Sequence, residues 1–232
     1  MTSLTPRVAA LVPAAGQGVR LAAGMPKAFV PLRGRPLLWH CVQGLLASGC
    51  IHLVVVAVGA RHHDRARAVL AEAGEQVKIV TGGAHRSDSV RAALHSASDA
   101  DVVVVHDAAR CLAPISVIQS VVHAVVAGAP AVVPVLTVVD TIKQVNSAGC
   151  VVRTVDRSSL RAVQTPQGFA ADLLRRAHQA PSALVTDDAG LVEALGVPVT
   201  TLLGHPHAFK ITTPFDLAVA EMLTGAQAVD QA

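Results

Sequence analysis

A loop rich in alanine and glycine follows the first apolar run of the chain and ends near two basic residues. The run Val8–Val12 leads into Pro13-Ala-Ala-Gly-Gln-Gly18, and Arg20 and Lys27 follow. Small residues let backbone N–H groups approach a polyphosphate, and the two cations can neutralise its charge. The glycine spacing fits neither a dinucleotide fingerprint nor a Walker A loop. We therefore expect a triphosphate cradle here, with an ordinary strand-to-helix turn as the alternative.

A second polar segment, Gly82–Ser89, follows the third strand-like run. Its two glycines allow the backbone to approach a flat base or a ribose, and Ser89 can hydrogen-bond a base edge. Ser87 or Asp88 is expected to cap the next helix. Arg86 stands at the helix start, where the dipole disfavours a cation, so we expect an anionic partner, either a phosphate or a carboxylate.

The segment His106–Arg110 follows an all-valine run. A carboxylate at the end of a central parallel strand suits Mg²⁺, which prefers one or two carboxylates plus substrate phosphates and water, so Asp107 is the candidate metal ligand. Arg110 can clamp a phosphate through two parallel hydrogen bonds. The alternative is a structural ion pair between Asp107 and Arg110. His106 is expected to position its neighbours rather than to act as a base.

Composition narrows the class of protein. The 232 residues suit one α/β domain spanning 1–232, and 52% hydrophobic residues can build a large core. With 2% aromatic residues, dispersed basic residues and a formal charge of +3, the chain favours neither nucleic acid nor a membrane surface as a partner. The four cysteines and 11 histidines have no metal-ligand spacing. Reduced thiols and the lack of a signal peptide predict a cytoplasmic protein.

Strand-like and helix-like segments alternate along the chain. Continuous β-branched runs predict strands covered on both faces, and the alternation predicts a Rossmann-like, doubly wound, mostly parallel sheet. Ligands bind such sheets at the carboxyl ends of the strands, where the polar segments above all fall. The expected strands are Ala9–Val12, Leu53–Val58, Val77–Val80, Val102–Val105, Ala131–Val135 and Val197–Leu202, and the expected helices are Leu37–Ala47, His62–Ala73, Ser87–Ala97, Ser116–Ala127 and Asp172–Gln179.

Residues 137–158 break this alternation. They predict a hairpin of two strands around Asn146-Ser-Ala-Gly149. Two interpretations stay open on the pattern alone: a projecting arm that pairs with a second subunit, or an edge hairpin packed on its own domain. The small and polar tail from Thr224 to Ala232 is expected to fray.

The ordered set of segments resembles the 2-C-methyl-D-erythritol 4-phosphate cytidylyltransferase family from about Val8 to Leu223. The segments that carry the resemblance are Pro-Ala-Ala-Gly-x-Gly-x-Arg20, Pro26-Lys27, Gly82-Gly83 with Arg86 and Asp88-Ser89-Val90, His106-Asp-Ala-Ala-Arg110, Asp140-Thr-Ile-Lys143, Thr154-Val-Asp-Arg157, Thr165-Pro-Gln-Gly-Phe169, Thr186-Asp-Asp188 and Lys210-Ile-Thr. Ala84, His85 and Cys111 depart from the family pattern, but none replaces a residue assigned to chemistry.

The resemblance implies a nucleotidyltransferase or GT-A-like sheet with a protruding arm, CTP and a polyol phosphate as substrates, a divalent cation, and a homodimer formed through residues 137–158. Thr141, Arg157 and Thr165 would come from the partner's arm and its flanks. The implied catalytic residues are Arg20, Lys27, Arg157 and Lys210; the nucleotide-binding residues are Ala14, Ala15, Gly16, Gly18, Gly82, Gly83, Arg86, Ser89, Asp107 and Ala108; the acceptor-binding residues are Asp107, Arg110, Thr141, Arg157, Thr165, Thr186 and Lys210.

The implied reaction is in-line attack of the acceptor phosphate on the α-phosphorus of CTP, with release of pyrophosphate. A phosphate monoester is already ionised near neutral pH, so positioning and charge stabilisation suffice without a strong base. The alternatives are a ribitol 5-phosphate cytidylyltransferase and a nucleotide-binding regulator without catalysis. A glycosyltransferase is a third, although it would usually carry an Asp-x-Asp motif where only Asp107 stands.

Overall fold

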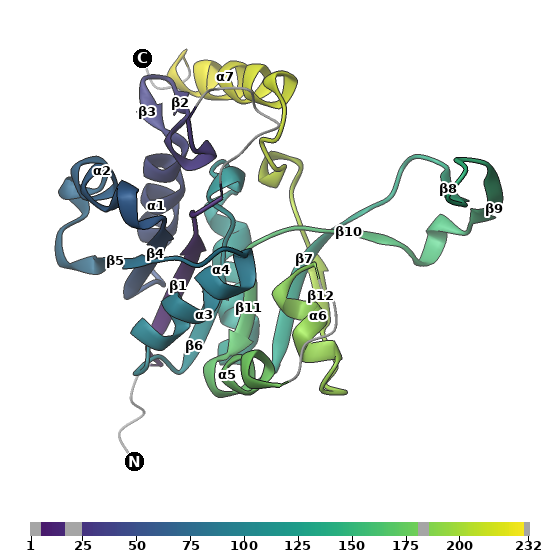
Figure 1. Ribbon diagram of the computed structural model, residues 1–232, viewed down its shortest axis with the longest axis horizontal. Helices are drawn as coiled ribbons and strands as arrows, with labels where there is room; N and C mark the ends of the chain where they lie inside the picture. The colour runs from purple at the N-terminus through teal and green to yellow at the C-terminus, as the bar shows by residue number, and fades with distance from the viewer. Residues whose placement is uncertain (1–5, 17–24, 181–185, 230–232) are drawn as a thin grey trace.

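The computed structural model describes residues 6–16, 25–180 and 186–229 and has a central sheet of eight strands. The strands are β1 (Val8–Pro13), β4 (Leu53–Val58), β5 (Val77–Thr81), β6 (Val102–Val105), β7 (Ala131–Thr137), β10 (Arg161–Val163), β11 (Gln167–Ala170) and β12 (Thr200–Leu203). Their order is β10-β7-β11-β6-β1-β4-β5, and β12 pairs with β7 (Figure 1).

The centre of the sheet is parallel and fully buried. Strand β1 pairs in parallel with β4 and β6, so Leu11 lies between Val55 and Val105. Valine and alanine fill these strands because β-branched and small apolar side chains pack well on a sheet covered on both faces. The expected strands Leu53–Val58 and Val102–Val105 agree with β4 and β6 residue for residue.

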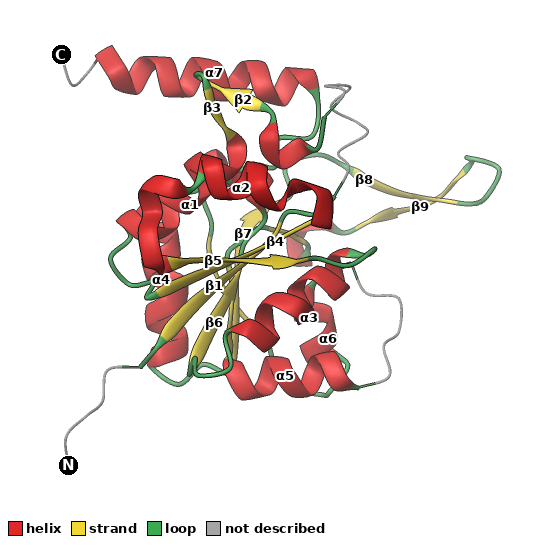
Figure 2. Cartoon of the chain, turned by 60° about the vertical axis from the view of Figure 1, so that its left-hand side comes forward, coloured by secondary structure: helices red, strands yellow, loops and turns green. Residues whose placement is uncertain are grey.

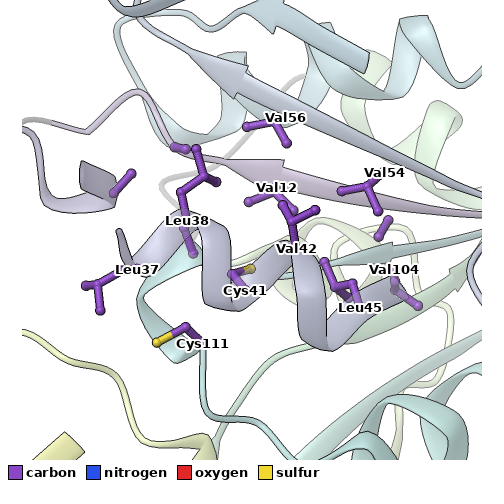
Figure 3. Packing of buried hydrophobic residues seen from close by; sticks show 14 of the residues in the cluster. Val12, Leu37, Leu38, Cys41, Val42, Leu45, Val54, Val56, Val104 and Cys111 are labelled. Carbon is purple, nitrogen blue, oxygen red and sulfur yellow. The ribbon is translucent and has the colours of Figure 1, made fainter. Parts of the chain in front are cut away.

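Helices cover both faces, which confirms the doubly wound α/β prediction. One face carries α1 (Leu37–Ala47), α2 (His63–Val69) and α4 (Ile115–Val126), and the other carries α3 (Arg86–Ser96), α5 (Ala171–Gln179) and α6 (Asp188–Glu193) (Figure 2). Figure 3 shows how α1 places Leu38, Val42 and Leu45 against the valines of β1 and β4. Two separate apolar layers thus hold the strand ends in fixed positions.

Three elements differ from expectation. Strand β11 lies antiparallel between β6 and β7, so the sheet is mixed, and this short strand carries too little pattern to be recognised. The expected helix His62–Ala73 ends at Val69 and continues as a 3₁₀ turn, Ala71–Gln76, in which Gly74 has a φ of +56°. The last expected strand begins later, at Thr200.

The tail from Thr224 to Ala232, which was expected to fray, is helical as far as Val229. Helix α7 (Pro214–Val229) continues through it, and residues 230–232 lie outside the described part of the chain. The short hairpin of β2 (Pro31–Leu32) and β3 (Arg35–Pro36) supports this helix, because Arg33 forms an ion pair of 3.2 Å with Glu221 and donates its backbone N–H to the same carboxylate. This contact anchors α7 at Glu221, before the tail begins.

The predicted hairpin is confirmed and forms a sheet of its own. Strands β8 (Ile142–Val145) and β9 (Val151–Val155) pair antiparallel around a turn in which the Asn146 side chain accepts from the N–H groups of Ala148 and Cys150. The hairpin stands away from the central sheet (Figure 1), and all residues from 143 to 154 are exposed. The interpretation as an edge hairpin packed on its own domain is therefore wrong.

Within the described ranges, none of the helices has the length and apolar character needed to cross a membrane.

Candidate active site

A pocket of about 180 Å³ opens at the carboxyl ends of β1 and β6. It brings together five segments of the chain: the loop after β1, the 3₁₀ turn that begins at Lys27, the start of α3 with the loop before it, the loop after β6, and the segment of Lys210 before α7. The predicted residues that line it are Ala14, Ala15, Gly16, Lys27, Gly83, Arg86, Ser89, Asp107, Ala108 and Lys210. Gly18 and Arg20 lie outside the described residues.

An ion-paired carboxylate forms the centre of this pocket. Asp107 accepts from Arg86 Nε at 3.1 Å and from Lys210 Nζ at 2.7 Å, so each of its oxygens faces one cation. Burial alone would raise the pKa of Asp107, but Arg86 and Lys210 outweigh it and hold this pKa well below its ordinary value. The partners of Asp107 are therefore Arg86 and Lys210, and the alternative ion pair between Asp107 and Arg110 is not formed. Asp107 is thus an anion at neutral pH and is not a proton acceptor there.

The anionic partner expected for Arg86 is a pair of carboxylates. Beyond Asp107, Arg86 Nη1 bonds Asp188 Oδ2 at 2.6 Å, and Asp188 Oδ1 lies 3.0 Å from His178 Nε2. Burial favours the neutral guanidinium, but the two carboxylates outweigh it and raise the pKa of Arg86 further. Burial would raise the pKa of Asp188, whereas His178 and Arg86 lower it. The series of paired side chains His178–Asp188–Arg86–Asp107–Lys210 therefore extends from α5 into the pocket.

The two glycines are required by packing within the chain. A Cβ on Gly82 would lie 2.7 Å from Ser89 Oγ and 2.8 Å from the Ala15 methyl group, and one on Gly83 would overlap the side chain of Asp88. The loops after β1 and β5 can thus approach each other closely only because these positions lack side chains.

The helix cap lies earlier in the chain than either residue expected. His85 is the N-cap of α3, and its backbone N–H donates to Asp88 at 3.2 Å in a capping box. Ser87 is not the cap, and Asp88 takes part as the third helical residue. Ser89 is buried and lines the pocket. Its hydroxyl donates to the His85 carbonyl, which fixes the hydroxyl beside the first turn of α3.

His106 and Thr165 form a buried layer under the Asp107 loop. The Thr165 hydroxyl accepts from the Asp107 N–H at 3.1 Å and lies 3.0 Å from His106 Nδ1. Burial lowers the pKa of His106 to about 4, so the ring is neutral at pH 7, as its expected positional role requires. Thr165 was expected from a partner's arm, but its hydroxyl is buried against its own chain, which corrects that assignment.

Arg110 lies next to the pocket without lining it. Its guanidinium donates to the carbonyls of Ala208 at 2.7 Å and Val163 at 3.3 Å, and Nε is buried with no partner among the described residues. Burial lowers the pKa of Arg110. The side chain joins the loop after β6 to β10 and to the 3₁₀ turn Pro206–Ala208, close to Lys210.

The remaining acceptor-binding candidates do not line the pocket in this single chain. Thr186 is exposed, and the next residue, Asp187, is the N-cap of α6, and its side chain accepts from the Gly190 N–H at 3.1 Å. Thr141 and Arg157 are exposed at the base of the arm, where Arg157 donates to the Val139 carbonyl. The arm residues and the pocket are therefore separate in one protomer.

Sequence reasoning missed three buried polar residues behind the site. Asp188 and Gln167 lie within two of the segments that carry the resemblance, but their residue types alone predict no role, and His178 lies in none of those segments. All three side chains are buried, and each is hydrogen-bonded. The adjacent carboxylates of Asp187 and Asp188, in otherwise apolar sequence, were the available signal.

The fold and the pocket together define a nucleotidyltransferase: a mixed α/β sheet presents small-residue loops and converging cations at its strand ends. Comparison with known proteins identifies the family. The sequence model of 2-C-methyl-D-erythritol 4-phosphate cytidylyltransferase matches residues 8–225, and this chain belongs to that family. It is accordingly an enzyme of isoprenoid biosynthesis that acts on CTP and 2-C-methyl-D-erythritol 4-phosphate.

The relatives are similar over nearly their whole lengths. The chain is 60% identical to the 2-C-methyl-D-erythritol 4-phosphate cytidylyltransferase of Saccharopolyspora erythraea, covering 92% of this chain and 97% of that one. It is 56% identical to the protein of the same name from Rhodococcus jostii, with 93% and 94% covered. The crystal structure of the Thermus thermophilus enzyme is similar with a TM-score of 0.72 at 36% identity, covering 95% of this chain and 98% of that one.

Proposed function

We propose that cytidylyl transfer takes place in the pocket around Asp107. The observation that carries this proposal is the convergence of Lys27, Arg86 and Lys210 on one pocket beside a small-residue loop. Ala14, Ala15, Gly16 and Gly18 would surround the CTP phosphates, and Gly82, Gly83, Ser89 and Ala108 would meet the base and ribose. Arg20 and Lys27 would stabilise charge on the α-phosphate, while Lys210 and Asp107 would orient the acceptor.

The proposed reaction is an in-line displacement. An oxygen of the acceptor phosphate forms a bond to the α-phosphorus of CTP as the bond to pyrophosphate breaks. The acceptor oxygen is already ionised, so no proton needs to be removed. The site suits this requirement, because the pKa of Asp107 is held low by two cations and burial lowers the pKa of His106 to about 4. Catalysis would rest on positioning and on stabilising developing charge.

A divalent cation is part of this proposal. No group of three or more ligating side chains occurs among the described residues, so the protein does not offer a complete metal cage there. Magnesium needs only one or two carboxylates when phosphates and water complete its shell, and Asp107 lines the pocket. Both Asp107 oxygens are ion-paired, so the CTP phosphates would supply most ligands. When bound, Mg²⁺ would neutralise charge on the leaving pyrophosphate.

We further propose that the arm completes the site of a second subunit. Thr141 and Arg157 are exposed and separate from the pocket of their own chain, although the resemblance to the family implies that both bind the acceptor. The arm also exposes apolar side chains that water disfavours: Val139, Val151 and Val152 are 77%, 59% and 61% exposed. A symmetric homodimer would cover these valines and bring each Arg157 to the other chain's pocket. Arg110 and Thr165 would support the acceptor side from the pocket's own chain.

Pyrophosphate release tests the pocket assignment. We expect Lys27→Ala and Lys210→Ala to lower turnover by roughly 10²-fold or more, as for other preorganised charge contacts. Lys78→Ala is the matched control, because Lys78 lies on β5 and donates to the Ser96 carbonyl outside the pocket. Normal turnover by both pocket variants would contradict the proposal.

Mixing two inactive variants tests the exchanged arm. Lys27→Ala removes a pocket cation and Arg157→Ala removes an arm cation, so a mixed dimer would have one intact site. An equal mixture should regain about a quarter of wild-type activity, because half of its dimers are mixed. No recovery after subunit exchange would show that Arg157 acts within its own chain.

A cytoplasmic location belongs to the same proposal. All four cysteines are free thiols, which suits a reducing compartment. Fractionation of cells that express the chain, with activity measured in each fraction, tests it.

A further inference from the structure

We propose that Asp188 and His178 are positioning residues for the reaction, acting together through Arg86. As a buried pair they hold the Arg86 guanidinium in the orientation in which its Nε–H donates to the Asp107 carboxylate. Neither residue lines the pocket. The inference rests on the proposed role of that pocket.

The two side chains are almost completely buried behind the site. The side chains of Asp188 and His178 are 1% and 4% exposed, and both Asp188 oxygens are used, one by Arg86 Nη1 at 2.6 Å and one by His178 Nε2 at 3.0 Å. A buried carboxylate is costly unless it is paired and hydrogen-bonded. Asp188 therefore has one favourable geometry, and this geometry fixes where Nη1 of Arg86 can lie.

The guanidinium transmits that constraint to the pocket. It is planar, and its donors point in fixed directions, so binding Nη1 to Asp188 sets the direction of Nε. Nε then donates to Asp107 at 3.1 Å, and the other oxygen of Asp107 receives Lys210. Without Asp188, Arg86 and Lys210 would share a single carboxylate, and Arg86 would be free to turn toward a bound phosphate.

Asp188 is itself tied to the central sheet. Gln167, buried on β11, donates from Nε2 to Asp187 at 2.7 Å and accepts the Ala189 N–H at Oε1 at 3.3 Å. One bond holds the Asp187 carboxylate and the other holds the Ala189 backbone, so the residues on both sides of Asp188 are fixed. The start of α6 is thus held against the strand that pairs with β6, the strand that leads into Asp107. A shared rigid support for both carboxylates is what a positioning role needs.

The first test uses conservative replacements. Asp188→Asn keeps the shape but removes the charge, and we expect kcat/KM for CTP to fall about 10- to 100-fold, the range of a small misplacement of reacting groups. His178→Leu should cause a similar loss. His178→Gln, which places an amide N–H near the position of Nε2, should recover activity to within about threefold of wild type. Asp172→Asn is the control on α5, because that side chain is 94% exposed.

A double-mutant cycle separates positioning from general support of the fold. If Asp188 acts only through Arg86, then Asp188→Asn should lower kcat/KM by less than about twofold when added to Arg86→Ala. An equal further loss in that background would overturn the inference, as would full activity of Asp188→Asn in the native background. Equal activities of His178→Leu and His178→Gln would also overturn it.

The outcomes for Arg86 distinguish this inference from the proposed function. An impaired Arg86→Ala with a normal Asp188→Asn would refute the positioning role alone. Wild-type activity of Arg86→Ala would refute the role of Arg86 in the pocket and, with it, the positioning role.

Discussion

Replacing His106 by Asn should reduce the loss of unfolding free energy that the protein shows as the pH falls. Burial lowers the pKa of His106 to about 4 from an ordinary value of 6.5, so between these values the unfolded chain binds a proton that the folded chain does not. Stability from the neutral ring is complete above pH 6.5 and is lost as the pH falls toward 4. The full loss of unfolding free energy is about 3 kcal/mol, at about 1.4 kcal/mol for each unit by which the pKa is lowered.

Urea denaturation at pH 7 and at pH 5 measures this effect. The contribution of His106 to the free energy of unfolding should fall by about 2 kcal/mol between pH 7 and pH 5. The free energy of unfolding of His106→Asn should therefore fall by about 2 kcal/mol less than that of the wild type. Asparagine keeps an amide near the position of Nδ1 and can still bond Thr165. His95→Gln, at an exposed position on α3, is the control and should keep the wild-type difference. Equal differences for His106→Asn and wild type would show that the buried His106 ring does not contribute to the acid sensitivity of the fold.

Three further predictions concern the surroundings of the pocket. Gly82→Ala should raise KM for CTP and destabilise the fold by roughly 1–3 kcal/mol, because its Cβ would lie 2.7 Å from Ser89 Oγ and 2.8 Å from the Ala15 methyl group. Gly44→Ala is the control: it has open space for a Cβ on helix α1, so it should be neutral or stabilising in the same assays. Arg110→Ala should lower stability by about 1–3 kcal/mol by calorimetry, because two carbonyls lose a charged donor, and unchanged stability would argue against this clamp. A maleimide at pH 7.5 should label exposed Cys150 and leave Cys111 unlabelled in the native protein, since burial raises the pKa of the Cys111 thiol to about 12; equal labelling by mass spectrometry would contradict this.

The central strands could be predicted because their signal is local. The valine runs of β4 and β6 predict buried strands from the local sequence alone, and a loop follows directly after each run. Strand β11 gave no such signal. Its four residues include a buried glutamine and a glycine, and its partners lie at Val104 and Val132, so only the assembled sheet makes it a strand.

Several residues that line the pocket were predictable from the sequence, but their ion pairs were not. The small-residue loop, Asp107 and the cation at the start of α3 could each be recognised by type and position. The partner of Arg86 could not, because Asp188 is 102 residues away in the sequence and follows a different strand. Long-range ion pairs leave no periodic pattern, which is also why Arg110 was expected at a phosphate and instead bonds two carbonyls.

Pyrophosphate release from CTP and Mg²⁺ by the purified chain, with 2-C-methyl-D-erythritol 4-phosphate and ribitol 5-phosphate compared as acceptors, is the most direct test of the proposed reaction. We expect a strong preference for 2-C-methyl-D-erythritol 4-phosphate, and loss of that release in Lys210→Ala. Preference for ribitol 5-phosphate, or CTP binding without release from either acceptor, would contradict it.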